Sequence, residues 1–481
     1  MLSILGRPQR VCNGLTRREM IQAGGAGLFG LSLPQLLAAE QSAVHFRNAR
    51  AKSVLFLYLF GGPSQLETFD LKPEAPSKLR GPFNPIASRT PDLKLCEHLS
   101  RSARISDKFC VIRTMTHPHN DHNACHYIQT GHKWTRSAEN GSDVNARDTD
   151  WPSMGSIVEY LSSREANTRL RTLPDYVYLP NPLGHIQGYD RTGQYAGWLG
   201  AAYNALATRI RKQDSTDNPY SRNCTDAELD FRIKGLVSKT EIPLDRLNRR
   251  DSLLKQFDQQ RSHLERSKRY RAYDGMREKA LALVTSDRIQ TALDIRQEPD
   301  ALRDRYGRHL FGQSVLMGRR IIEAGSRFVT VVWDAPDGYS WDSHRNSQSL
   351  EKYLIPGFDQ SFSALLEDMD QRGILDETLV VAVGEIGRTP TATFKHGPFG
   401  RDHWSYCFPC VLAGAGIRGG VAYGRSDRDA AYPSEHPVSP EDLAATIYHA
   451  LGIDPELRVP DQQERPTAIL DGGRPLTELF G

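Results

Sequence analysis

The segment Ser53-Val54-Leu55-Phe56-Leu57-Tyr58-Leu59-Phe60, which is followed by Gly61-Gly62-Pro63, decides the fold class. It is apolar throughout and does not alternate with polar residues, which is typical of a strand buried on both faces, as in a parallel sheet. Five further segments have the same character, and they are 109–113, 176–179, 327–333, 378–383 and 408–413. The sequence therefore predicts a mostly parallel central sheet.

Three later segments have the spacing of amphipathic helices. Each has apolar residues at helical intervals and a glycine directly after it, and they are 312–324, 354–372 and 440–451. The last one begins after Ser439, a good N-cap residue, and has Glu441 and Asp442 in its first turn. Alternation of strands and helices over this length predicts an α/β three-layer sandwich, with helices on both faces of the sheet.

The composition is that of a globular protein. Of 481 residues, 39% are hydrophobic and 25% are charged, which excludes a disordered chain, a collagen-like fibre and a polytopic membrane protein. Lys and Arg total 61 against 58 Asp and Glu, and they are spread along the chain, so we expect no nucleic-acid partner. The segment at about 241–290 is highly charged with sparse leucines, and it predicts a solvated helical insertion, with a partner-binding arm as the alternative.

The N-terminal residues have the order of an export signal. Arg17-Arg18 precede a weakly apolar, glycine-rich stretch at 21–39, and small residues follow. This pattern predicts a twin-arginine signal over 1–43 and a single domain over 44–481. We expect a periplasmic or extracellular protein with no stable membrane span in its mature chain, because the stretch is too rich in Gly and too short for one.

Six cysteines remain after the predicted signal. They are Cys96, Cys110, Cys125, Cys224, Cys407 and Cys410. An oxidising compartment permits disulfides, but six cysteines allow fifteen pairings and the sequence does not choose among them. Cys407 and Cys410 are expected to be packed or separately paired, rather than a redox pair, because residues three apart on a strand face opposite ways.

Polar side chains gather where the predicted strands end, which is where ligands bind in parallel sheets. Asp342 and His344 follow the strand at 327–333, Glu385 and Arg388 follow 378–383, and Asp402 and His403 precede 408–413. Five histidines, among them His119 and His122, lie between positions 117 and 132 after the strand at 109–113. Carboxylates and imidazoles at several strand ends indicate a site for a divalent metal ion, Zn, Mn or Ca, that activates water.

Two further roles follow from the chemistry of these side chains. Arg388 is expected to bind an oxygen pair of a phosphate or sulfate ester, because the guanidinium presents two parallel donors. His119 and His122 are candidates for nucleophile, general acid or further ligand, since imidazole exchanges protons near neutral pH.

A family resemblance covers the chain from about Ser53 to its end. The segments that carry it include 61–64, 150–155, 197–200, Trp341-Asp342-Ser343-His344, Gly384-Glu385-Ile386-Gly387-Arg388-Thr389-Pro390 and Gly400-Arg401-Asp402-His403-Trp404. On these the chain resembles the sulfatase-like family of unknown function numbered 1501, whose members are typically exported with a twin-arginine signal. Segments 375–385, 439–448 and 471–476 resemble the wider alkaline phosphatase and sulfatase superfamily, which implies the fold of that superfamily.

The resemblance also implies roles for particular residues. Glu385 stands where superfamily members keep an Asp ligand, and Ile386 stands where they keep His or Asn, so one ligand is lost. Asp342 and His344 resemble the Asp/His pair of a second metal, with His403 as a distal histidine. The first strand lacks its usual Asp ligand, and only Glu67 and Asp70 in the loop that follows offer a carboxylate.

The nucleophile of the superfamily is missing. Relatives place Cys, Ser or Thr about ten residues before a Thr-Gly pair, and counting back from Thr130-Gly131 reaches Asp121. Cys125 lacks the Pro and Arg of a formylglycine motif, which argues against type I sulfatase chemistry.

Two functions remain open at the level of sequence. The first is an exported metal-dependent hydrolase of phosphate or sulfate esters, acting on an anionic ester or a sulfated polysaccharide. The second is a non-catalytic protein of the same fold that binds a polysaccharide or assembles with another exported protein. The geometry of Asp342, His344, Glu385 and His403 separates them, because ligands of one ion must share a common point.

Overall fold

The structure, a computed structural model, describes residues 46, 48–136, 144–165, 173–214, 216–231, 287–335, 340–344, 348–393 and 399–481. The predicted export signal and nearly all of the predicted insertion at 241–290 lie outside these residues. Both therefore stay predictions.

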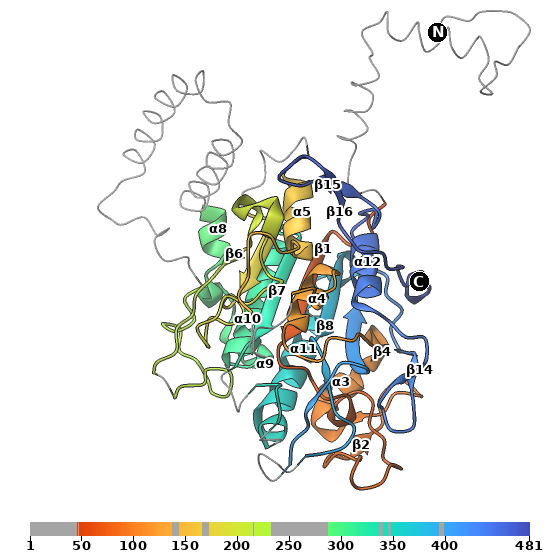
Figure 1. The fold of residues 1–481 in the computed structure, drawn as a ribbon. Helices are drawn as coiled ribbons and strands as arrows, with labels where there is room; N and C mark the ends of the chain where they lie inside the picture. The colour runs from red at the N-terminus through yellow and green to blue at the C-terminus, as the bar shows by residue number, and fades with distance from the viewer. Residues whose placement is uncertain are drawn as a thin grey trace, which may run out of the picture.

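The core is an eight-stranded sheet of order β12-β4-β11-β8-β1-β7-β5-β6 (Figure 1). Its strands are β1 (Ser53–Leu59), β4 (Phe109–Met115), β5 (Tyr176–Leu179), β6 (Leu206–Ala207), β7 (Phe328–Trp333), β8 (Thr378–Val383), β11 (Phe408–Ala413) and β12 (Val421–Tyr423). All six predicted strands are confirmed, and the short edge strands β6 and β12 are additional. Neighbouring strands are parallel except around β11, which runs antiparallel to both β4 and β8.

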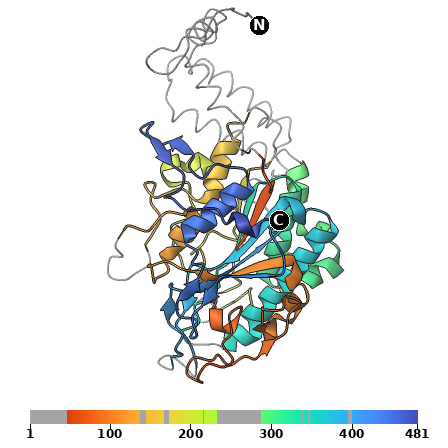
Figure 2. The same ribbon diagram turned by 90° about the vertical axis from the view of Figure 1, so that its right-hand side faces the viewer.

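Helices cover both faces of the sheet, which confirms the predicted three-layer sandwich (Figure 2). Successive residues of β1 point to opposite faces, so Leu55 and Leu57 belong to one apolar core and Phe56 and Tyr58 to the other. The first core includes α3 (Ser100–Arg104), α9 (Asp300–Tyr306), α10 (Leu310–Glu323) and α11 (Ile355–Gln371). The second includes α4 (Ala124–Thr130), α5 (Met154–Ser162) and α12 (Pro440–Ala450).

The three predicted helices are α10, α11 and α12. A short π-helical turn, Leu350–Leu354, leads into α11. The predicted cap of α12 is present as a capping box, in which the Asp442 backbone N–H donates to Ser439 Oγ and the Ser439 backbone N–H donates to Asp442 Oδ2. The six described cysteines are buried and form no disulfide, so Cys407 and Cys410 are packed in the core and are not a redox pair.

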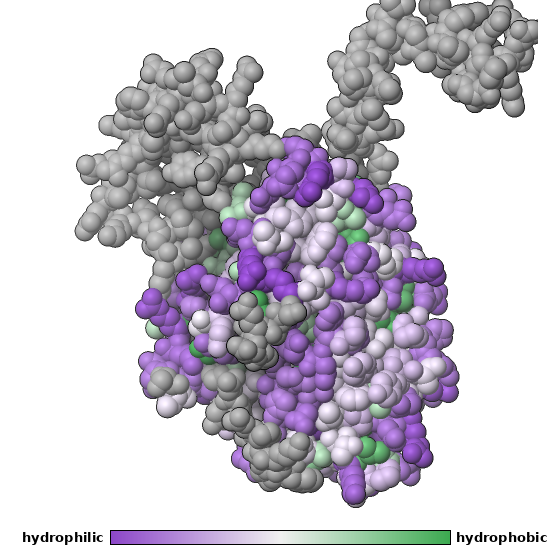
Figure 3. Space-filling view, in the orientation of Figure 1, coloured by the Kyte–Doolittle hydropathy of each residue, from purple (hydrophilic) through white to green (hydrophobic). Residues whose placement is uncertain are grey.

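Hydrophilic residues dominate the described part of the face that Figure 3 shows. No helix in this part of the chain combines the length and the apolar character needed to cross a membrane. On the face drawn in Figure 3, hydrophobic residues form only small, separate patches among hydrophilic ones.

Strand direction determines which loops meet. Because β1, β4, β7 and β8 are parallel to one another, their carboxyl ends reach the same edge of the sheet. The antiparallel strand β11 instead presents its leading residues there. The loops after β4, β7 and β8 and the segment before β11 are thereby brought together.

Candidate metal centre

Four side chains converge at this edge of the sheet. The Nε2 atoms of His344 and His403 lie 2.9 Å apart, and they lie 3.1 and 3.2 Å from Oδ1 of Asp342. Nε2 of His122 lies 3.2 Å from Oδ2 of the same carboxylate. His122 immediately precedes the Asn123 N-cap of α4, Asp342 and His344 follow β7, and His403 begins the short strand β10 (His403–Trp404). We call these four residues the cluster.

A carboxylate lies behind each of two histidines of the cluster. Nδ1 of His122 lies 2.7 Å from Oε1 of Glu385, and Nδ1 of His344 lies 2.9 Å from Oδ1 of Asp402. A carboxylate that accepts a hydrogen bond from Nδ1–H leaves Nε2 with a free electron pair, as in the carboxylate–histidine–metal arrangement. Both Nε2 atoms then face Asp342, so two hydrogen-bond acceptors meet a carboxylate that also only accepts.

The donor set fits a transition-metal ion. Ligand atoms at about 2.1 Å from a shared tetrahedral ion lie roughly 3 to 3.5 Å apart. His122, Asp342 and His403 each offer one ligand atom, and these three atoms lie within 4.8 Å of one another. Nε2 of His344 adjoins this group, at 3.1 Å from Asp342 Oδ1 and 2.9 Å from His403 Nε2. Three imidazoles and one carboxylate suit Zn or another first-row ion, whereas Ca takes six to eight oxygen ligands. Of the three ions predicted from the sequence, the residues present thus fit Zn and Mn and do not fit Ca.

Glu385 is connected to the cluster through His122. Its carboxylate is fully buried and accepts hydrogen bonds from the backbone N–H of Gly61, at 2.9 and 3.1 Å, and from the Tyr58 hydroxyl at 3.1 Å. The four residues that were predicted to share one ion therefore do not all lie at a common point. Asp342, His344 and His403 come together directly, while Glu385 joins them through His122.

The charges of the cluster shift its pKa values. Burial alone would lower the pKa of His122, but the hydrogen bonds to Asp342 and Glu385 raise it to about 9. Burial would raise the pKa of Asp342, but the adjacent Arg388 and the three histidines hold it well below its usual range. For His403, burial outweighs the hydrogen bond to Asp342 and lowers the pKa. In the absence of metal, these side chains therefore form an ion-pair network.

Arg388 has a different place from the one expected for a substrate-binding residue. Its side chain is fully buried, and its guanidinium lies 2.5 Å from Oδ1 of Asp342. It also donates to the backbone carbonyls of Gly61 and Gly62. These contacts make Arg388 a buried counter-charge to Asp342, and its other donors are taken up by backbone carbonyls.

Three other predicted residues make contacts that do not reach the cluster. Glu67 forms a buried ion pair with Arg401, with Oε1 2.8 Å from Nη2. Asp70 accepts from Ser426 and pairs with Lys72 at 3.0 Å. The His119 ring packs against Tyr127, with ring centroids 5.4 Å apart, and burial lowers its pKa.

Sequence reasoning missed Tyr58, Gly61 and Arg401 as supports of the centre. Arg401 anchors the segment that carries Asp402 and His403 through its bonds to Glu67 and to the carbonyl of Leu79. Gly61 has a φ of 111°, and a Cβ there would clash with the backbone nitrogen of Asp342. The Gly-Gly pair after the first strand was the available signal, because such a pair permits close approach of another backbone.

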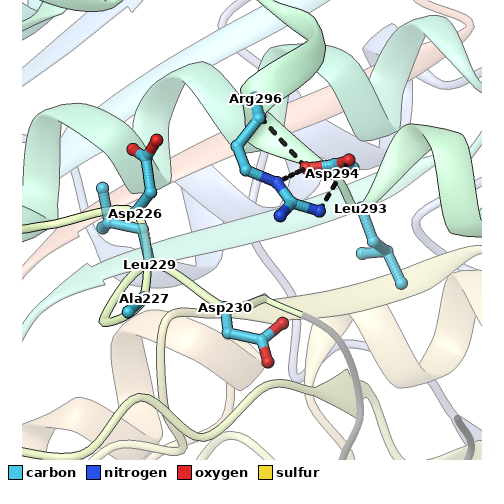
Figure 4. A pocket seen from close by; sticks show the side chains of 7 residues that line it. All are labelled: Asp226, Ala227, Leu229, Asp230, Leu293, Asp294 and Arg296. Atoms are coloured by element: carbon cyan, nitrogen blue, oxygen red, sulfur yellow. Dashed lines mark hydrogen bonds and ion pairs between the residues drawn. The ribbon is translucent and has the colours of Figure 1, made fainter.

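A separate hollow beside α8 (Asp287–Ala292) is also acidic, but its charges are paired locally (Figure 4). Arg296 bonds Asp294 at 2.6 Å, and Arg303 bonds Asp226 at 2.5 Å. It contains none of the residues of the cluster, so the carboxyl edge of the sheet remains the candidate site.

Solved structures that are similar to this chain share little sequence with it. Among curated proteins no sequence matches the chain. A phosphonate monoester hydrolase from Silicibacter pomeroyi is similar at 13% identity, with a TM-score of 0.35, over 89% of this chain and 76% of that one. The PsFucS1 sulfatase from Pseudoalteromonas sp. is similar at 11% identity, with a TM-score of 0.34, over 88% and 72%. A phosphonate monoester hydrolase of Agrobacterium radiobacter is similar at 12% identity, with a TM-score of 0.34, over 89% and 77%.

A family model covers almost all of the described fold. It matches residues 51–480, which include every strand of the central sheet and every residue of the cluster. The chain therefore belongs to the family described as "Protein of unknown function (DUF1501)".

Proposed function

We propose that the protein is an exported, metal-dependent hydrolase of phosphate or sulfate esters. The observation that carries the proposal is the donor set, in which the Nε2 atoms of three histidines surround the carboxylate of Asp342 at 3.1 to 3.2 Å. Imidazole nitrogens and a carboxylate that converge in this way form a donor set that a divalent cation can share. His122, Asp342, His344 and His403 hold that cation in this proposal.

The residues of the chain divide the work at such a site. When bound, a divalent ion supplies positive charge that polarises an ester oxygen and makes water more acidic. Glu385 and Asp402 orient the imidazoles of His122 and His344 through Nδ1. Arg388 pairs with the Asp342 oxygen that His344 and His403 also face, and it keeps this carboxylate ionised. The cluster side chains are 14% to 26% exposed, so an ester could reach them from solvent.

Water is the attacking group in this proposal. Cys125 is buried, and its thiol donates to the carbonyl of Thr192 rather than facing the cluster. Asp121, at the position of the superfamily nucleophile, is exposed and accepts from the backbone N–H of Asn123. Neither side chain is placed to attack an ester at the cluster.

Metal content tests the proposal. Elemental analysis of the folded protein should find about one equivalent of a divalent transition metal in the wild type, and little in Asp342→Ala and His403→Ala. His436→Asn is the matched control, because it removes an exposed histidine with a φ of 52°, a conformation that Asn tolerates. A protonated His122 would make the same contacts without metal, so a folded, metal-free wild type would overturn the proposal.

Activity and export need separate tests. The metal-loaded protein should hydrolyse 4-nitrophenyl phosphate or 4-nitrophenyl sulfate, and Asp342→Ala should not. A metal-loaded protein that turns over neither ester class would favour the non-catalytic alternative.

Replacing Arg17 and Arg18 by Lys should hold the protein inside the cell, and export of that variant would contradict a twin-arginine signal.

A further inference from the structure

Another hollow, of about 510 Å³, opens beside the start of α12 and contains no residue of the cluster. Its wall comes from the residues after β4, from α4 and the segment that follows it, from the residues before β11, and from the first turn of α12. Helices α4 and α12 pack against each other beside it (Figure 1). We call it the α12 hollow. Its volume is within the range of sites that bind small molecules.

The wall of the α12 hollow is held by hydrogen bonds between distant segments. The backbone N–H of His117 donates to the carbonyl of Ser405 at 3.0 Å, which joins the loop after β4 to the segment before β11. The backbone N–H of Arg474 donates to Oδ1 of Asp442 at 2.8 Å, which joins the C-terminal segment to α12. The hollow is therefore pre-formed.

The feature that points to a ligand is the carboxylate of Glu441, which lines the α12 hollow. Glu441 is only 5% exposed, and its Oε2 atom has no hydrogen-bond partner among the described residues. Its Oε1 atom lies 3.6 Å from Nζ of Lys133, whose side chain is 56% exposed. This separation is too long for a hydrogen bond. A carboxylate that leaves water needs a donor or a close opposite charge, so Oε2 has room for a donor from a ligand.

The other charged groups of the wall do not supply that donor. His117 is neutral, because its Nδ1 accepts a hydrogen bond from a backbone N–H and burial lowers its pKa to about 4. Asp442 adds a second carboxylate, whose oxygens are engaged by backbone N–H groups and by the Ser439 hydroxyl. Two carboxylates against Lys133 leave an excess of negative charge. The hollow therefore suits a cation and disfavours an anion.

We infer that the α12 hollow binds a small organic molecule through a protonated primary amine, which donates to Oε2 of Glu441. Tyr127 and Tyr406 also line the hollow, and aromatic rings attract an ammonium group. Burial and the neighbouring Glu441 carboxylate raise the pKa of Tyr127, so its hydroxyl stays protonated. A metal ion fits less well, because only at the cluster does the described part of the chain bring three potential metal ligands together.

Binding of three matched probes tests the inference, and it depends on neither metal nor catalysis. In ligand-observed NMR titrations at pH 7, benzylamine should bind the wild type about tenfold more tightly than benzyl alcohol, and benzoate should not bind. Glu441→Gln keeps the shape of the side chain and should weaken benzylamine binding about tenfold. Asp471→Asn is the matched control, because Asp471 is an exposed acid near Tyr127 that does not line the hollow. An equal loss in both variants would overturn the site.

Two further variants keep the test decisive if Glu441→Gln does not fold. Lys133→Gln removes an exposed cation that competes for Glu441, so it should tighten benzylamine binding about threefold, and a weaker binding would contradict the inference. Asp342→Ala should bind benzylamine like the wild type, whereas a loss there would place the amine at the cluster instead. A wild type that binds metal and cleaves 4-nitrophenyl esters but not benzylamine would overturn the α12 hollow alone. Binding of benzylamine to Lys133→Gln only would make Lys133 the occupant and would also overturn it.

Discussion

The two carboxylate–imidazole pairs behind the cluster have the same chemistry and very different surroundings. Glu385 is fully buried, and Gly61, Tyr58 and His122 all donate to it. The Asp402 side chain is 41% exposed and meets Nδ1 of His344 at the surface. The first pair is part of the protein core, and the second belongs to a surface loop. The comparison predicts that the first pair contributes mainly to folding and that the second contributes mainly to the metal binding proposed above.

The largest effect is expected from Glu385→Ala. Three buried donors would lose their acceptor, and removing one partner of a buried charged network costs about 3–5 kcal/mol. Urea unfolding in EDTA measures this loss. Asp402→Ala is the matched variant of the exposed pair, and it should change the unfolding free energy by no more than about 0.5 kcal/mol. Equal losses in the two variants would erase the distinction between the pairs.

The second-largest effect is expected in the pH dependence of stability of the metal-free protein, to which the buried pair of Glu385 and His122 contributes. The folded pKa of His122 is about 9, and an unfolded histidine titrates near 6.5. A raised folded pKa stabilises the protein fully below the unfolded value, and this contribution is lost as the pH rises through the folded value. The unfolding free energy in EDTA should therefore fall by up to about 3 kcal/mol between pH 6.5 and 9. His122→Gln should flatten that slope, and a wild-type slope of zero would contradict the assignment.

The exposed pair, Asp402 and His344, is expected to affect metal affinity. Asp402→Ala removes the carboxylate that orients His344, and losses of this kind weaken metal binding about 10–100-fold. Competition with a chelator measures the dissociation constant. Asp121→Ala serves as the control, because it removes an exposed carboxylate one residue from His122 that accepts from the backbone N–H of Asn123 rather than from an imidazole. The same loss in both variants would indicate a general charge effect.

The smallest expected effect is on stability, and it concerns one hydrogen bond to Glu385 in the buried pair. Tyr58→Phe removes one of the hydrogen bonds to Glu385 and should cost about 1 kcal/mol of stability. Tyr448→Phe is the matched control, since its buried hydroxyl has no hydrogen-bond partner among the described residues, and it should be nearly neutral. A neutral Tyr58→Phe would mean that Gly61 and His122 alone satisfy the Glu385 carboxylate.

Much of the fold could be predicted because it depends on local patterns. The six buried strands and the helices α10, α11 and α12 follow from apolar runs, periodicity and caps such as Ser439. The direction of β11 could not be predicted, because a buried strand has the same apolar pattern whichever way it runs. Its antiparallel course places His403, which precedes the strand, at the edge where the other strands end.

The candidate site could be predicted in part. Placing chemistry at the strand ends correctly brought Asp342, His344 and His403 together, since parallel strands share one carboxyl edge. The roles within the site were not accessible in this way. His122, rather than Glu385, contacts Asp342. Arg388 is the counter-charge of Asp342, and Glu67 pairs with Arg401. The two members of each pair are far apart in the sequence. Their positions along the chain therefore do not indicate which acidic side chain contacts which basic one.

The sequence by itself determined the sheet, most of its helices and the edge at which polar chemistry collects, because burial leaves a periodic record in neighbouring residues. Only the tertiary structure decided which groups meet in the cluster, which support it and which are counter-charges. That choice depends on distances of about 3 Å between loops that no local pattern connects, and on which carboxylates the core buries.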